Sequence, residues 1–271
     1  MLFAVVTFSL MKVFVKTLSH IPVMEVILFR AIISLIISYA ILRKQRVNVF
    51  GNNKKLLIGR GVTGAIALTM NFYLVQEIPL ATTSTLTYLA PVFSTLIGIF
   101  MVKEKVRWVQ WLFFAISFAG ILVVQGFDIR ISYFHLGIGI ATSMFMGFAY
   151  NFVRKLNTTE HPLVIIFYFP LVLLPVASVW SFFHWVPPVG IDWFNLLMVG
   201  ITTQVAQFFM TKSYQNAEIA KVSILNYLGL VFSLLFGYFL FDETFNFLTY
   251  VGMGMVILGV VLNVLLKKKP S

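Results

Sequence analysis

The chain has 271 residues, of which 60% are hydrophobic and only 11% are charged. An ordinary soluble domain carries about 25% charged residues, so a water-soluble fold could not bury this much apolar surface. The absence of cysteine excludes disulfides, thiolate nucleophiles and cysteine-type metal sites. The net charge of +11 would suit a nucleic-acid partner in another context, but the positions of the basic residues, described below, argue against one.

Ten hydrophobic segments follow one another along the chain, separated by short polar or Pro/Gly-containing breaks. A helix needs about 20 largely apolar residues to cross the roughly 30 Å hydrocarbon core of a bilayer. The segments lack the strand-like alternation of a β-barrel. We therefore predict an all-α integral membrane protein with ten transmembrane helices, over residues 2–18, 22–42, 56–76, 80–102, 108–126, 135–154, 162–183, 193–213, 218–241 and 246–266.

Basic residues concentrate in alternate connections between these segments. If the N-terminus is cytoplasmic, 16 of the 20 Lys and Arg residues lie in cytoplasmic connections or the C-terminal tail, and Arg130 alone lies outside. Short loops rich in Lys and Arg stay in the cytoplasm. The distribution therefore predicts a multi-pass protein of the inner (cytoplasmic) membrane with both termini in the cytoplasm, and it explains the positive charge without nucleic acid.

The sequence aligns with itself at an offset of 139 residues. Residues 76–124 match residues 215–263 without a gap, and 14 of the 49 positions are identical. Each half holds five segments, an odd number, so the second copy enters the membrane in the opposite sense. We predict two inverted five-helix repeats, over residues 1–126 and 135–266, followed by a cytoplasmic basic tail over residues 267–271.

Several short motifs occur in a fixed order along the chain: Phe14-Val-Lys16, Pro22, Phe29-Arg30, Pro79, Ala81, Tyr88, Pro91, Glu104, Gly120-Ile-Leu-Val, Ala217 to Glu243, and Gly259-Val-Val. Together they resemble the ten-helix EamA branch of the drug/metabolite transporter superfamily over nearly the whole chain. The resemblance implies that helices 1–4 and 6–9 surround a central cavity, with helices 5 and 10 at the periphery. Members of the family carry amino acids, nucleotide-linked compounds and other small metabolites, so the resemblance does not specify the substrate.

Charged groups near the ends of the segments, such as Arg60, are counted with the connections. Four other ionisable side chains lie within the predicted helices, where a charge is costly and commonly marks function: Lys12, Lys16, Glu25 and Arg30. The first hairpin turns near residue 20, so Lys16 and Glu25 share a depth near the outer surface, and we predict a structural ion pair between them. Lys12 and Arg30 lie deeper, with no acid at their level. We interpret them as candidate contacts for a carboxylate or phosphate of the substrate. Snorkelling of Lys12 and helix-end contacts of Arg30 are an equally good alternative.

Polar side chains within the helices are candidates for the neutral part of a binding site. Tyr88 beside Thr87 and Tyr227 beside Asn226 occupy equivalent positions in the two repeats, with Ser84 and Ser223 one turn away. Such residues also join helices through hydrogen bonds, so a packing role stays open for each of them. The weaker candidates are Asn71, Tyr150, Asn151, Gln204 and Gln207.

Two further features are predicted to shape the helices. Pro91 removes a backbone hydrogen bond within its segment, which predicts a kink, and we interpret that kink as a candidate gate. Glu104 and Glu243 end equivalent segments on opposite sides of the membrane. We expect basic groups or helix N-termini to hold both carboxylates in architectural roles.

These observations favour a secondary transporter or exporter that moves a small metabolite by alternating access. A substrate with a carboxylate or phosphate, such as an amino acid or nucleotide-like compound, would suit the interior cations. A channel-like facilitator is the first alternative, although no ring of charge is visible. An intramembrane enzyme is less favoured, because the sequence holds neither H-E-x-x-H nor G-x-S-x-G. We expect no cofactor and no metal site; the expected partners are the lipid bilayer and a small-molecule substrate, and a homodimer is left open.

Overall fold

A computed structural model describes residues 1–101, 103, 108–156, 159–216 and 228–265. All regular structure in these residues is α-helical. The helices are α1 (Leu2–Thr17), α2 (Val23–Lys44), α3 (Lys54–Glu77), α4 (Leu80–Thr87), α5 (Ala90–Met101), α6 (Trp108–Phe127), α7 (Tyr133–Leu156), α8 (Pro162–Phe183), α9 (Asp192–Asn216), α11 (Leu228–Phe241) and α12 (Phe247–Leu265).

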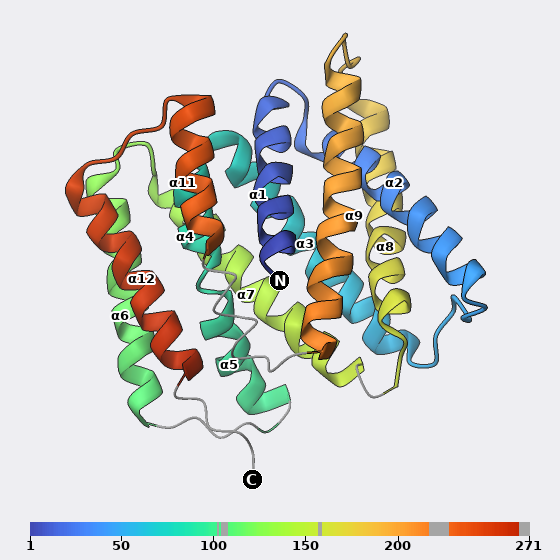
Figure 1. Cartoon of the computed structure of the whole chain (residues 1–271), viewed down its shortest axis with the longest axis horizontal. Helices are drawn as coiled ribbons and strands as arrows, with labels where there is room; N and C mark the ends of the chain where they lie inside the picture. The colour runs from blue at the N-terminus through green and yellow to red at the C-terminus, as the bar shows by residue number, and fades with distance from the viewer. Residues whose placement is uncertain (102, 104–107, 157–158, 217–227, 266–271) are drawn as a thin grey trace.

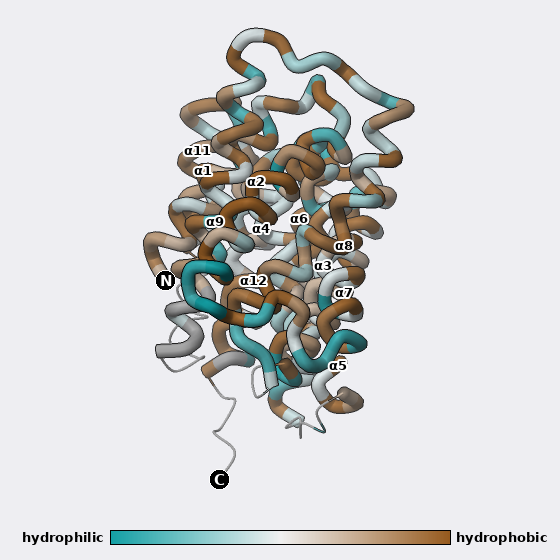
Figure 2. The backbone as a smooth tube through the Cα atoms, turned by 90° about the vertical axis from the view of Figure 1, so that its right-hand side faces the viewer, coloured by the Kyte–Doolittle hydropathy of each residue, from teal (hydrophilic) through white to brown (hydrophobic). Residues whose placement is uncertain are grey.

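The helices run back and forth between two ends of the molecule (Figure 1), as expected of a multi-pass membrane protein. Among the described residues, five segments are long and apolar enough to span a bilayer: α2, α4 with α5, α6, α7 and α8. The helices α11 and α12 are apolar but shorter. Among the long helices, α3 and α9 are the most polar: α3 carries exposed lysines near its start, and α9 buries Asn195, Thr203 and Gln204. Figure 2 shows hydrophobic residues along most of the helical path.

We call one end of the molecule the outer end, after the orientation predicted from charge. It contains the connections at residues 18–22, 78–79, 128–132, 184–191 and 242–246. The inner end contains residues 45–53 and the C-terminal ends of α5 and α7. The predicted basic tail, residues 267–271, lies outside the described residues.

The helix bounds repeat along the chain with the predicted offset. Val23–Lys44 and Pro162–Phe183, which form α2 and α8, are separated by 139 residues at both ends. The pairs α3 and α9, α5 and α11, and α6 and α12 agree with this offset to within one residue at each end. The architecture is therefore two inverted five-helix repeats.

Helices of one repeat pack mainly against helices of the other. The chief pairs are α1 with α9, α3 with α7, α2 with α8, and α6 with α12. A Cβ atom at Gly61 would lie 2.6 Å from Val172 Cγ2, and one at Gly200 would lie 2.5 Å from Ile33 Cδ1. Gly61 and Gly200 are equivalent in the two repeats, as are Ile33 and Val172, because each pair is separated by 139 residues. The same close approach therefore occurs twice, with the repeats exchanging the glycine and the side chain that it contacts.

The pair α6 and α12 lies at one edge of the bundle (Figure 1), where the resemblance places helices 5 and 10. Their backbones touch, because a Cβ atom at Gly252 would lie 2.8 Å from the carbonyl oxygen of Gly120. Gln110 Nε2 also donates to Asn263 Oδ1 across this interface, at 2.7 Å. Small residues and an interhelical hydrogen bond are how helices associate in lipid.

The fourth predicted transmembrane segment is interrupted just before Pro91. The helix α4 ends at Thr87 and α5 begins at Ala90. Proline has no N–H to donate to the carbonyl of Thr87, four residues earlier, so a break in helical geometry is expected here. A gating role for Pro91 stays a prediction.

The contact between α6 and α12 predicts unequal responses to two substitutions in one helix. Gly252→Leu would insert a side chain against the backbone of α6, whereas the Cβ position of Gly254 has no atom within 4 Å. We expect Gly252→Leu to lower stability by about 1–3 kcal/mol, the usual cost of overpacking. Gly254→Leu should unfold like the wild type. Denaturant unfolding in mixed micelles measures both, and equal stabilities would contradict this packing.

Candidate substrate-binding site

Three helices meet at the outer end through one buried ion pair. Lys16 Nζ of α1 lies 2.7 Å from Glu243 Oε1, which follows α11, and also donates to the carbonyl of Ile78 at 2.9 Å. The N–H of Leu80, the first residue of α4, donates to both oxygens of Glu243, at 3.1 and 2.9 Å. An anion at a helix N-terminus is favoured by the helix dipole. We call Lys16, Glu243 and the Leu80 N–H the outer closure.

The predicted ion pair between Lys16 and Glu25 is wrong. Glu25 Oε2 accepts a hydrogen bond from the N–H of Val186 at 3.0 Å, and Glu25 Oε1 has no hydrogen-bond partner in the described part of the chain. Equal depth in a hairpin does not determine which way a side chain points around its helix, and here Lys16 faces α4 and α11 instead. Glu243 is held by a basic group and a helix N-terminus, as expected, while Glu104 lies outside the described residues.

Other contacts join the outer connections to one another. Gln76 Nε2 donates to the carbonyls of Leu18 and Ile21, at 2.9 and 3.1 Å. His20 Nε2 lies 3.1 Å from Asp192 Oδ2, which links the turn after α1 to the start of α9. Polar contacts therefore join the outer connections both within the first repeat and between the two repeats.

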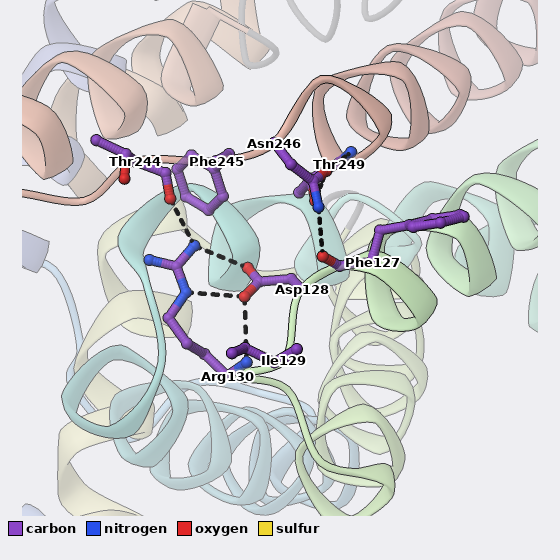
Figure 3. Close-up of a pocket in the computed structure, with 8 residues that line it drawn as sticks. All are labelled: Phe127, Asp128, Ile129, Arg130, Thr244, Phe245, Asn246 and Thr249. Atoms are coloured by element: carbon purple, nitrogen blue, oxygen red, sulfur yellow. Dashed lines mark hydrogen bonds and ion pairs between the residues drawn. The ribbon is translucent and has the colours of Figure 1, made fainter.

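A surface pocket of about 250 Å³ lies between the α6–α7 and α11–α12 connections (Figure 3). Its charged groups already have partners: Arg130 pairs with Asp128 and donates to the carbonyl of Thr244 at 2.9 Å. Asn246 Nδ2 donates to the carbonyl of Phe127 at 2.6 Å. This pocket joins the outer connections of the two repeats, away from the predicted binding residues.

A first interior cluster forms around Lys12. Its Nζ atom donates to Ser84 Oγ at 2.7 Å, and Ser84 Oγ lies 2.7 Å from Ser233 Oγ of α11. The hydroxyl of Tyr88 lies beside Gly229 on the same helix, where a Cβ atom would come within 2.9 Å of it. The structure thus brings Lys12, Ser84 and Tyr88 to the junction of α1, α4 and α11. The predicted partners Ser223, Asn226 and Tyr227 lie outside the described residues.

Asn151 occupies the position of Lys12 in the second repeat. Asn151 Nδ2 donates to the carbonyls of Ser94 and Gly147, at 2.8 and 2.9 Å, and so joins α7 to α5. Ser94 is in turn the equivalent of Ser233, so each repeat places a polar side chain near the same serine of the partner helix. This contact supports the packing interpretation of Asn151, although its Oδ1 atom has no partner among the described residues.

A second interior cluster forms around Arg30, which is 2% exposed. Arg30 Nε donates to Thr203 Oγ1 of α9 at 3.2 Å. The guanidinium carbon lies 5.0 Å from the centre of the Phe169 ring and 5.8 Å from that of Phe72. Because Phe169 is the equivalent of Arg30 in the second repeat, a residue here touches its own counterpart, and the pair lies close to the pseudo-two-fold axis.

Arg60 also belongs to this second cluster, and sequence reasoning missed it. We assigned it to a cytoplasmic connection, but α3 already begins at Lys54, and the Arg60 guanidinium carbon lies 5.1 Å from the centre of the Phe169 ring. Its Nη1 atom occupies the space that a side chain at Gly64 would need. The sequence did contain a signal for the interior position of Arg60: an arginine four residues before a glycine in an apolar segment. The glycine leaves room for the guanidinium to fold inward.

The remaining candidate residues differ in their burial and in their hydrogen bonds. Asn71 is buried and its Oδ1 atom has no partner among the described residues. Gln204 Nε2 donates to Ser38 Oγ at 3.0 Å, which joins α9 to α2 and leaves Oε1 without a partner there. Tyr150 is exposed but lies within electrostatic range of Arg60. Thr87 donates to the carbonyl of Ser84 within its own helix, and Gln207 is half-buried.

The sequence matches the EamA-like transporter family over residues 1–125 and 134–265. The chain belongs to this family. The two matched stretches correspond to the two repeats of the fold, and a transporter family agrees with the resemblance found in the sequence.

Individual relatives cover most of the chain. The pseudopaline exporter CntI of Pseudomonas aeruginosa is 29% identical over 94% of this chain and 91% of its own length. Human solute carrier family 35 member G1 is 24% identical over 87% of this chain and 70% of its own length. The S-adenosylmethionine uptake transporter of Rickettsia felis is 26% identical over 68% of this chain and 63% of its own length. A crystal structure with 16% identity has the same fold, with a TM-score of 0.67 over 97% of this chain and 96% of the other.

The outer closure predicts a large difference between two neighbouring acidic residues. Glu243→Gln would leave Lys16, whose side chain is 16% exposed, without its anion, whereas Asp242 is exposed and Asp242→Asn suits its positive φ of 51°. Breaking a buried pair by removing one partner costs about 3–5 kcal/mol. We expect that loss for Glu243→Gln and a change within about 0.5 kcal/mol for Asp242→Asn. Unfolding in mixed micelles is the measurement, and similar stabilities would show that the pair is not structural.

Proposed function

We propose that this protein is a secondary transporter that moves a small metabolite bearing a carboxylate or phosphate across the cytoplasmic membrane by alternating access. Family membership supports a transport role, and an inverted repeat supplies two equivalent halves that can exchange their packing about a shared site. The names of its relatives include an exporter and an uptake transporter, so similarity leaves the direction of transport open.

One observation carries the proposal: interior cations without protein anions lie beneath a closed outer end. Lys12 is hydrogen-bonded to Ser84, and Arg30 to Thr203, and neither has a carboxylate partner among the described residues. Lys16, by contrast, is neutralised by Glu243. A charge in a membrane interior is costly and commonly has a function. For a cation without a counterion, we infer that this function is to bind an anionic substrate. The interior of this transporter therefore suits an anionic substrate, which would supply the missing negative charge when it binds.

The outer closure also favours a carrier over an open channel. It joins α1, α4 and α11, which come from both repeats, so opening the outer end requires the repeats to move relative to each other. By symmetry the inner end would then close, which is the alternating-access cycle. In this cycle the conformation described here is the one closed to the outside, with both termini in the cytoplasm.

Transport by this mechanism predicts saturable flux that depends on Arg30. A thermal-shift screen of the purified protein against carboxylates and phosphates would select the ligand, whose uptake into proteoliposomes is then measured. We expect Arg30→Met to reduce uptake at least about tenfold, because a charge-assisted hydrogen bond is lost. Arg43→Met, which removes an exposed arginine from the same helix, should leave uptake unchanged. Flux that rises linearly with concentration would favour the channel-like alternative.

Opening of the outer end can be followed with a single introduced thiol, because the natural chain has no cysteine. Ser233 is 1% exposed and lies inside the outer closure, beside Ser84. In right-side-out vesicles we expect Ser233→Cys to react slowly with a membrane-impermeant maleimide. Adding Glu243→Gln should accelerate labelling severalfold, while adding Asp242→Asn should not. Equal labelling of all three proteins would show that the closure does not control access.

A further inference from the structure

Two arginines from neighbouring helices share one aromatic ring near the middle of the bundle. Arg30 of α2 and Arg60 of α3 each place a guanidinium carbon about 5 Å from the centre of the Phe169 ring, at 5.0 and 5.1 Å. The two carbons can therefore be no farther apart than the sum of these distances. Arg60 acts electrostatically on Arg30, as two like charges must at this range.

The helices bring these two side chains together from different depths. Arg60 lies six residues from the inner end of α3, and Phe169 lies seven residues from the inner end of α8, so both are about 10 Å inside the bundle. Arg30 is farther from the inner end of α2. The Arg60 guanidinium folds along α3 onto Gly64, one turn toward the outer end, which brings it closer to Arg30.

Several donors of this pair have no acceptor in the described part of the protein. Arg30 Nη1, Arg60 Nε and Arg60 Nη1 are buried atoms without a hydrogen-bond partner, and no described carboxylate pairs with either arginine. The ring of Phe169 attracts cations over its face, but it cannot accept the in-plane N–H bonds of a guanidinium. Two neighbouring positive charges whose buried donors have no acceptor are unfavourable unless an anion joins them.

We propose that Arg30 and Arg60 form one binding site for a doubly charged oxyanion, such as a dicarboxylate or a phosphate. This inference rests on the proposed function and narrows its substrate class. Two guanidinium groups with no protein counterion need two negative charges for neutrality, and their planar donor sets match carboxylate and phosphate oxygens. The half-buried Arg60 lies nearer the inner end and would meet the ligand first, with Arg30 completing its coordination.

The site predicts opposite effects of one substitution on the empty and the liganded protein. Arg60→Met keeps the apolar stem but removes a charge whose buried Nε and Nη1 atoms have no acceptor among the described residues, so the melting temperature without ligand should equal or exceed that of the wild type. Succinate or inorganic phosphate should raise the melting temperature of the wild type but hardly that of Arg60→Met. A residue with a purely structural role would lower stability on replacement and leave the response to ligand unchanged.

Equilibrium binding to purified protein in phospholipid-free detergent tests the proposal directly. Succinate and phosphate are compared with acetate and chloride at equal ionic strength, because general screening affects all salts alike. We expect the dianions to bind at least tenfold more tightly than the monoanions. Arg30→Met and Arg60→Met should each weaken dianion binding about tenfold to a hundredfold. Arg43→Met, which removes an exposed arginine from α2, should bind as the wild type does.

Two milder variants keep the test decisive if an Arg→Met protein does not fold. Gly64→Ala leaves both charges in place but displaces Arg60 Nη1, and Arg60→Lys keeps the charge but loses the planar donors. Both should weaken dianion binding severalfold. Equal affinity for dianions and monoanions, or undiminished binding by these variants, would overturn the two-arginine site. Dianion binding without saturable flux would instead contradict the proposed transport function and leave this site intact.

Discussion

In a hydrocarbon surrounding, a charged side chain needs a partner within the protein, and this requirement organises the interior of the bundle. Lys16 meets it, because its ammonium group contacts both Glu243 and the carbonyl of Ile78, and these contacts join α1 to the segments beside α4 and α11 at the outer end. Arg30 and Arg60 do not meet it, because aromatic faces and one threonine hydroxyl supply no negative charge. The same physical rule thus separates a cation that is neutralised within the protein from two that are not, and the latter are the ones for which we propose a ligand.

The inverted repeat explains where these groups lie. The helices α2 and α8 pack against each other near the pseudo-two-fold axis, so that Arg30 touches Phe169, its own counterpart. At this position one repeat supplies a charge and the other an aromatic surface. Lys12 and Asn151 differ in a similar way, with a cation on one side of the axis and an amide on the other. A symmetric scaffold therefore carries an asymmetric set of interior side chains.

The glycines within the helices have two different roles. Gly120 and Gly252 bring the backbones of α6 and α12 into contact at the edge of the bundle, where no predicted binding residue lies. Gly64 instead leaves room for a guanidinium. Both kinds of glycine appear alike in the sequence, since each lies within an apolar helix. Their roles differ because the neighbour that fills the vacant space is a backbone in one case and a charged side chain in the other.

The sequence by itself determined the membrane environment, the inverted repeat and the interior position of Arg30, because hydrophobic length, charge bias and repeat spacing are local properties that need no tertiary contact. It also indicated that a cation or a helix N-terminus would hold Glu243. Only the tertiary structure decided which partner each charge meets. Lys16 and Glu25 share a depth, yet rotation about their helix axes directs them to different neighbours, and Arg60 reaches the interior because its side chain folds along α3 toward Gly64. Depth follows from residue number, whereas direction around a helix acquires meaning only when the neighbouring helices are in place.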